Sequence, residues 1–140
     1  DGYVAAMKGV ILSRAPDVTL VDITSAIAPQ AVLQAAYVLA QAAPFFPTGA
    51  IHVAVVDPGV GIARRPLAIQ TSTAIFVGPD NGLFTDVLDS GAVTACVHLD
   101  RPRFWRDNPS STFHGRDIFA PVAAHPVSYP HLTPPTSDLV

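Results

Sequence analysis

Charged residues are scarce in this sequence, and lysine is almost absent. Charged residues make up 14% of the 140 positions, hydrophobic residues make up 49%, and Lys8 is the only lysine. With a formal net charge of −3, the chain has no broad positive surface of the kind that attracts nucleic acid or an anionic membrane. The high apolar content instead predicts one packed domain, with some apolar surface left to meet another domain or subunit.

One small cluster combines basic and aromatic residues, namely Arg101, Arg103, Trp105 and Arg106. A stacking platform for single-stranded nucleic acid needs several aromatic side chains along a basic groove, and this cluster is too small to provide one. We therefore interpret it as a solvated loop and expect no nucleic-acid partner.

Cysteine and long apolar runs are also nearly missing. Cys96 is the single cysteine, so an internal disulfide is excluded and a reducing, cytoplasmic location is favoured. No apolar run reaches the ~18–20 residues that span a bilayer, so we expect no membrane partner.

The histidines do not fall in a metal-binding spacing with cysteine or carboxylates, and His52 and His98 lie inside predicted strands, so we expect no metal site.

Apolar spacing and turn residues predict an α/β domain over residues 1–125. The predicted elements, in chain order, are a helix over Tyr3–Ser13, a strand over Val18–Ile23, a helix from Pro29 to the residue before Pro44, strands over Ile51–Val56, Leu67–Gln70 and Ala74–Val77, a helix over Leu83–Leu88, a strand over Val93–His98 and a helix over Arg116–Ala124. The strand, helix and strand of residues 18–56 form a βαβ pattern, which favours a mostly parallel sheet flanked by helices. Residues 126–140 are rich in proline, and we expect this tail to be disordered or an artefact.

Three polar loops are candidates for a functional site: residues 57–65, 78–82 and 111–117. Asp57 and Gly78 follow predicted strands, and ligands of open α/β sheets bind beyond the carboxyl ends of strands. We therefore expect the loops to converge. Each loop alone also has a purely structural interpretation. The first would be a turn begun by an Asx residue, the second a tight turn, and the third the N-terminus of a helix.

Spacing excludes several common sites. A dinucleotide-binding loop would carry a third glycine at the place of Arg64, after Gly59 and Gly61, and the phosphate loop of nucleoside triphosphatases has no counterpart in the chain. A serine nucleophile at Ser110 or Ser111 would lack the strand and helix that expose such a hydroxyl group.

Five segments of the sequence match a known family in order. They are DGYVAAMKGVIL, VDITSAIAPQAVLQAAYVL, FFPTGAIHVAVVDPGVGIARRPLAI, FVGPDNGLFT and SSTFHGRDIFAPVAAH, and they span nearly all of residues 1–125. Together they resemble the S-adenosyl-L-methionine hydroxide adenosyltransferase family, whose relatives include the fluorinase and the chlorinase. The resemblance implies the N-terminal α/β domain of an S-adenosyl-L-methionine hydrolase, which forms adenosine and L-methionine by attack of water or hydroxide on the ribose 5′ carbon. It implies S-adenosyl-L-methionine as the substrate and no cofactor.

The resemblance also implies a catalytic set of three residues that activate the water: Asp57, Arg64 and His114. The halogenases carry a tyrosine at the position of Asp57 and do not keep His114, so water is favoured over halide as the nucleophile. Asp57 and His114 are both candidates for the proton acceptor. Three alternatives stay open: a halogenase that makes 5′-halo-5′-deoxyadenosine, a non-catalytic nucleoside-binding fragment, and a structural salt bridge between Asp57 and Arg64 with His114 capping the last helix.

By motif position, the resemblance implies that Gln30, Thr112, Phe113 and Gly115 contact the substrate. Phe113 would pack on the ribose or the adenine, and Gly115 would leave room beside the reacting carbon. Family members also have an upstream aspartate that holds the ribose hydroxyls and a C-terminal β-barrel that completes the pocket across a homotrimer interface. Because the 140 residues contain neither part, we expect the chain alone to hold half of a site and the full-length protein to be a homotrimer.

Overall fold

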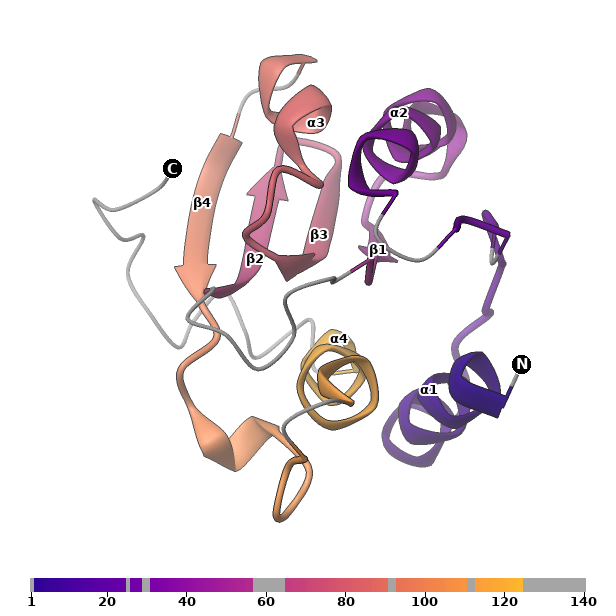
Figure 1. The fold of residues 1–140 in the computed structure, drawn as a ribbon, viewed down its shortest axis with the longest axis vertical. Helices are drawn as coiled ribbons and strands as arrows, with labels where there is room; N and C mark the ends of the chain where they lie inside the picture. The colour runs from indigo at the N-terminus through magenta and orange to yellow at the C-terminus, as the bar shows by residue number, and fades with distance from the viewer. Residues whose placement is uncertain are drawn as a thin grey trace.

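A four-stranded sheet lies at the centre of the fold, with helices on both faces (Figure 1). The computed structural model describes residues 2–24, 26–28, 31–56, 65–90, 93–110 and 113–124. Its strands are β1 (Ala50–Val53), β2 (Pro66–Thr71), β3 (Ala74–Pro79) and β4 (Val93–His98), in the sheet order β1-β3-β2-β4. Its helices are α1 (Gly2–Arg14), α2 (Val32–Ala42), α3 (Thr85–Ser90) and α4 (Ala120–Ala123). Helices α2 and α3 cover one face of the sheet, and α4 lies on the other face, between the sheet and α1 (Figure 1).

The sheet is mixed, whereas we predicted a mostly parallel one. Strand β1 pairs with β3 in parallel, but β2 runs antiparallel to both β3 and β4. The reason is the short connection between β2 and β3, because a connection of two residues joins antiparallel neighbours. The hydroxyl oxygen of Thr71 accepts the backbone N–H groups of Thr73 (3.3 Å) and Ala74 (3.1 Å) and so stabilises this turn. The α/β class itself is confirmed.

The predicted strand Val18–Ile23 is wrong, because these residues have no regular secondary structure. Val18 and Val21 are 44% and 62% exposed. An alternating apolar pattern becomes a strand only where a neighbouring edge supplies partners for its backbone groups. In the described residues β1 pairs with β3 and not with residues 18–23, so the βαβ unit that we inferred from this strand is not found in them.

Most of the other predicted elements are confirmed with small changes of boundary. Helix α1 extends one residue beyond the prediction at each end, and β4 has the predicted bounds. Helix α2 ends at Ala42, where a 3-10 turn, Ala43–Phe45, accommodates Pro44. Strand β1 ends at Val53, three residues before its predicted end. The residue at which we predicted the start of the second helix, Pro29, lies outside the described residues.

The last predicted helix, Arg116–Ala124, is divided into a π-helical turn, Gly115–Phe119, and the short helix α4. The division coincides with Pro121, which has no backbone N–H to donate to the carbonyl of Asp117, four residues earlier. That carbonyl instead accepts the backbone N–H of Arg106 at 2.9 Å. The π-helical turn is thereby tied to the loop that follows β4.

Apolar side chains fill the space on both faces of the sheet. Successive side chains of β3 point to opposite faces of the sheet. Phe76 packs in the cluster beneath α2 and α3, whereas Val77 packs in the cluster beneath α4. The first cluster includes Leu39, Ile69, Phe76, Phe84 and Cys96, and the second includes Val77, Val97, Leu99, Phe119 and Val122. Within the described ranges, no helix has both the length and the apolar character needed to cross a membrane.

Candidate functional site

The carboxyl ends of β1, β3 and β4 lie at the same end of the sheet, together with the start of β2. The register places Val53 opposite Val77, Pro66 opposite Pro79, and Leu67 opposite His98. The chain therefore leaves the sheet at this end after β1, after β3 and after β4. Ligands of open α/β sheets bind at such an end. Gly78 lies within β3 and the loop that begins at Asp57 lies outside the described residues, so the convergence of these loops stays a prediction.

Three of the seven predicted site residues fall within the described part of the chain. Phe113, His114 and Gly115 are consecutive, and His114 immediately precedes the π-helical turn and is half-buried. The other four predicted residues, Asp57, Arg64, Gln30 and Thr112, lie outside the described residues. The catalytic set of Asp57, Arg64 and His114 therefore stays a prediction.

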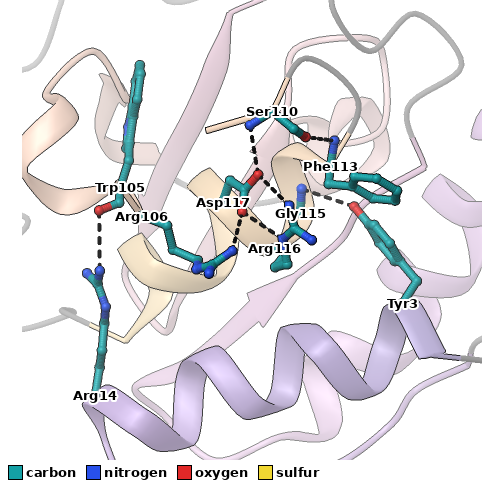
Figure 2. Close-up of polar contacts among 9 residues, drawn as sticks. All are labelled: Tyr3, Arg14, Trp105, Arg106, Ser110, Phe113, Gly115, Arg116 and Asp117. Carbon is teal, nitrogen blue, oxygen red and sulfur yellow. Dashed lines mark hydrogen bonds and ion pairs between the residues drawn. The ribbon is translucent and has the colours of Figure 1, made fainter. Parts of the chain in front are cut away.

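The segment that carries His114 is held by hydrogen bonds on both sides (Figure 2). The backbone N–H of Ser110 donates to Asp117 Oδ2 at 2.9 Å, and the backbone N–H of Phe113 donates to Ser110 Oγ at 2.8 Å. The backbone N–H of Asp117 in turn donates to the carbonyl of Phe113 at 3.0 Å. These bonds link the residues before and after His114, and Asp117 takes part on both sides.

Asp117 is a buried carboxylate with cationic partners. Its side chain is 1% exposed, and Oδ1 accepts hydrogen bonds from Arg116 Nε at 2.7 Å and from Arg106 Nη1 at 2.8 Å. Hydrogen bonds from Arg116 hold the pKa of Asp117 far below its ordinary range, against the opposing effect of burial, and the N–H of Ser110 and the side chain of Arg106 lower it further. Asp117 is therefore an anion at any physiological pH and is not a candidate proton acceptor.

Arg106 lies in an exposed loop, as we interpreted it, and it also has a partner that we did not predict. Its guanidinium reaches Asp117, although its side chain stays 43% exposed. Sequence reasoning missed this partnership because the two residues are eleven positions apart and no periodic pattern connects them. We interpreted the neighbouring pair Arg116 and Asp117 as the start of a helix, and the structure shows it as the centre of a network of charged hydrogen bonds.

Phe113 and Gly115 are in contact with helix α1 (Figure 2). The backbone N–H of Gly115 donates to the Tyr3 hydroxyl oxygen at 3.0 Å, and the rings of Tyr3 and Phe113 are 5.7 Å apart. A side chain at position 115 would collide with the Tyr3 hydroxyl and would lie 3.1 Å from the sulfur of Met7. Burial raises the pKa of Tyr3, so its hydroxyl stays protonated. The glycine at position 115 is thus needed for the close approach of α1.

The turn after β3 contacts both ends of the segment that contains Asp57 and Arg64. Asn81 Nδ2 donates to the carbonyl of Val56 at 2.8 Å, and Asn81 Oδ1 accepts the backbone N–H of Leu83 at 3.2 Å. Arg65 Nη2 donates to Asp80 Oδ2 at 3.2 Å, and the N–H of Asp80 donates to the Arg65 carbonyl at 2.9 Å. We predicted a tight turn or a functional loop here. The structure shows in addition that this turn is bound to Val56 and to Arg65.

A cavity opens beside this turn, between α3 and strands β2 and β4. Its volume is about 490 Å³, and its lining includes Ile69, Asp80, Phe84 and Cys96. Burial raises the pKa of the Cys96 thiol to about 11, so the thiol is protonated at neutral pH and is a poor nucleophile. The cavity thus offers no activated nucleophile, and Phe113, His114 and Gly115 do not line it.

His52 lies in the apolar core and not at the candidate site. It is 5% exposed, stacks on Phe76 with ring centroids 4.9 Å apart, and meets the edge of Phe46 at 5.4 Å. Burial lowers its pKa, which keeps the imidazole neutral. In the part of the chain that the structure describes, no group of three or more histidine, cysteine or acidic side chains is arranged to hold a metal ion.

Comparison with known proteins, by sequence and by structure, finds related proteins that match nearly the same share of this chain. An (R)-S-adenosyl-L-methionine hydrolase of Salinispora arenicola is 50% identical over 125 residues, which is 89% of this chain and 48% of that protein. A fluorinase of Nocardia brasiliensis is more distant, with 27% identity over 89% of this chain and 49% of the fluorinase. The crystal structure of an uncharacterized conserved protein from Thermotoga maritima matches with a TM-score of 0.87 and 40% identity over 90% of this chain and 49% of that one.

The chain spans about half the length of the curated relatives that it matches. The model of the SAM hydroxide adenosyltransferase N-terminal domain matches residues 1–133. This range contains the described sheet, both groups of helices and the segment that carries His114. The chain therefore belongs to the S-adenosyl-L-methionine hydroxide adenosyltransferase family, as its N-terminal domain.

Proposed function

We propose that the protein containing this chain hydrolyses S-adenosyl-L-methionine to adenosine and L-methionine, with water as the nucleophile. The observation that carries the proposal is the difference between two likenesses, 50% identity to a hydrolase against 27% to a fluorinase over the same share of the chain. The sequence supports it with Asp57 and His114, at positions where the halogenases carry a different residue. No metal or cofactor is needed for this reaction.

The chemistry explains which groups the site has to provide. The oxygen of water forms a bond to the 5′ carbon, the carbon–sulfur bond breaks, and its electron pair stays on the sulfur of methionine. Methionine leaves as a neutral thioether from a sulfonium, so this leaving group requires no general acid. Bulk water has a pKa of ~15.7, so the protein has to orient the water and remove its proton in the transition state.

We assign these tasks to Asp57, Arg64 and His114. Asp57 accepts a hydrogen bond from the water, Arg64 keeps that carboxylate ionised through a bidentate contact, and either Asp57 or His114 takes the proton. Holding the water in line with the breaking bond contributes up to roughly 7–11 kcal/mol in ideal intramolecular cases. The described structure supports the part of His114, because the residues on both sides of it are fixed by hydrogen bonds.

We assign substrate contacts to Phe113, Gly115, Thr112 and Gln30. Phe113 offers apolar surface for the ribose or the adenine, since it is 43% exposed. The Arg116 guanidinium lies 4.9 Å from the centre of its ring and helps to fix the orientation of that ring. A preorganised aromatic surface beside His114 favours a nucleoside substrate.

We infer that the full-length protein is a cytoplasmic homotrimer whose C-terminal β-barrel completes the pocket, with neither nucleic acid nor a membrane as a partner. Exposed apolar side chains support the need for further contacts, because Leu33 is 84% exposed and Phe45 is 89% exposed. Apolar surface of this kind is common where subunits or domains meet. Light scattering on the full gene product tests the inference, and a monomer would contradict it.

The proposed function is tested by incubating the full gene product with S-adenosyl-L-methionine and separating the products by chromatography. We expect adenosine and methionine in equal amounts, and a fall in kcat of about 100-fold or more for Asp57→Ala and for His114→Ala, because each removes a group that acts on the water. Asp17→Ala, at an exposed position, is the matched control and should leave kcat unchanged.

Two results would contradict the proposal. One is the absence of adenosine above the protein-free blank, which would favour a non-catalytic nucleoside-binding fragment. The other is the formation of 5′-halo-5′-deoxyadenosine when chloride or fluoride is added, which would make the protein a halogenase.

A further inference from the structure

The proposed mechanism uses Asp57, Arg64 and His114, and leaves the turn after β3 without a task. Yet the side chains of two consecutive residues in this turn reach the chain immediately before Asp57 and immediately after Arg64. Asn81 donates to the carbonyl of Val56 at 2.8 Å, and Asp80 pairs with Arg65 at 3.2 Å. One turn therefore contacts the residue before and the residue after positions 57–64.

The contact at Val56 is well defined because Asn81 is fixed at both ends of its amide. Its oxygen accepts the backbone N–H of Leu83, so its nitrogen is directed at Val56. The hydrogen bond to the carbonyl of Val56 is partly buried, so leaving this oxygen without a partner would cost free energy. A neutral amide is suited to this position, since it offers an acceptor to one backbone group and a donor to another.

The contact at Arg65 combines a side-chain pair with a backbone hydrogen bond. Arg65 and Asp80 are 35% and 25% exposed, so the ion pair is partly screened by solvent and is the weaker of the two attachments. The N–H of Asp80 also donates to the Arg65 carbonyl at 2.9 Å. This bond would survive the loss of the carboxylate, so the attachment would loosen rather than disappear.

The strand that leads into the turn also approaches the segment after β1 closely. The backbone N–H of Ala54 donates to the carbonyl of Val77 at 3.0 Å, and a side chain in place of Gly78 would collide with the carbonyl oxygen of Ala54. The path of the chain from Ala54 to Val56 is thus set by β3 and by the turn that follows it. A glycine at position 78 and an amide at position 81 serve the same approach.

We propose that Asp80 and Asn81 are positioning residues that set the places of Asp57 and Arg64 by holding their chain neighbours Val56 and Arg65. The proposal rests on the proposed function, because it presumes that Asp57 and Arg64 act on the water. Neither Asp80 nor Asn81 touches the reacting atoms. A displacement of a catalytic group by 1 Å costs about 100-fold in rate, so a small shift at either end of the segment lowers kcat.

The sharpest test is Asn81→Asp in the full gene product. The carboxylate has nearly the shape of the amide and still accepts the N–H of Leu83, but it has no donor for the carbonyl of Val56. We expect kcat to fall about 10–100-fold, KM to change little, and the melting temperature to change by a few degrees. A turn with a purely structural role would lower the melting temperature and leave kcat of the folded protein unchanged, and that result would overturn the proposal.

Asp80→Asn tests the other end with less risk to folding, because Asp80 lies partly in solvent. It removes the charge opposite Arg65, and we expect a smaller fall in kcat, about 3–10-fold. Asp86→Asn makes the same change at an exposed position six residues further along the chain and should leave kcat unchanged. Equal rates for the two variants would overturn the part assigned to Asp80.

Amide hydrogen exchange separates the failure of this proposal from failure of the proposed function. In Asn81→Asp we expect faster exchange in a peptide covering residues 56–65 and unchanged exchange in β2 and β4. If the wild-type protein forms no adenosine, the proposed function fails, and the exchange result alone decides whether Asn81 holds the segment. If the protein is active and both kcat and exchange are unaffected, the proposed function stands and the positioning proposal fails.

Discussion

On the face of the sheet that α2 and α3 cover, His52 is buried between two phenylalanine rings, whereas on the face that α4 covers the buried polar side chain is Asp117. The Nε2 atom of His52 has no hydrogen-bond partner among the described residues. The carboxylate of Asp117 accepts hydrogen bonds from two arginines and a backbone N–H. A neutral imidazole is tolerated in an apolar core, but a buried charge requires partners. The face with the partnered charge is also the one that carries His114.

The largest effect that we expect is from Asp117→Ala. Removing the carboxylate leaves the guanidinium groups of Arg106 and Arg116 without their partner and the N–H of Ser110 without its acceptor. Because the two arginines are 43% and 32% exposed, their charges stay hydrated, and the cost is the loss of charged hydrogen bonds, about 1.5–3 kcal/mol of unfolding free energy. Urea denaturation measures it, with Asp107→Ala as the control at an exposed position of the same loop. A loss below about 1 kcal/mol would mean that the two faces do not differ as described.

A smaller effect is expected from Ser110→Ala. The substitution removes the hydroxyl oxygen that accepts the N–H of Phe113 and leaves the backbone bond from Ser110 to Asp117 in place. A hydrogen bond of this kind contributes about 0.5–1.5 kcal/mol to stability. We expect the loss of transition-state stabilisation, calculated from kcat, to exceed the loss of unfolding free energy, because the bond fixes the residue before His114. A variant with normal kcat would show that Asp117 alone suffices to hold this segment.

The smallest effect near neutral pH comes from His52. Burial lowers the pKa of His52 below its ordinary value of 6.5, so its contribution is fully present above pH 6.5 and is lost as the pH falls below that value, because the unfolded chain binds the proton more readily. Asp117, with a lowered carboxyl pKa, loses its contribution only as the pH falls below its ordinary value of 3.8. Melting temperatures of wild type and His52→Leu between about pH 5 and 7 should differ in slope. Parallel curves would contradict this assignment.

Elements with a local cause could be predicted from the sequence. The apolar spacing of α1, the β-branched run of β1 and the proline after α2 all lie within a few residues of the structure they determine. The antiparallel pairing of β2 and β3 could have been predicted too, because only a short connection separates the predicted strands Leu67–Gln70 and Ala74–Val77, and a short connection joins antiparallel neighbours. The strand expected at Val18–Ile23 failed for the opposite reason, since a strand depends on a partner that its own sequence does not reveal.

The supports of the candidate site could not be predicted, because they join residues far apart in the chain. Asn81 reaches a carbonyl 25 positions earlier, and Gly115 meets a hydroxyl 112 positions earlier. Backbone carbonyls and N–H groups are present at every residue, so no sequence pattern marks the one that a side chain will meet. The motif around His114 was visible in the sequence, and the network that fixes it was not.

Pro121 has a consequence for anyone who would redesign this domain. Its ring removes the N–H that would donate to the carbonyl of Asp117 in an α-helix, and the N–H of Arg106 donates to that oxygen. A residue with a higher helix propensity at position 121 would stabilise the helix itself. Its backbone N–H would, however, compete with that of Arg106 for the carbonyl oxygen of Asp117. The loop after β4 would then lose one of its hydrogen bonds to the π-helical turn, while those to the Asp117 carboxylate would remain. A substitution that strengthens the helix would therefore weaken its connection to this loop.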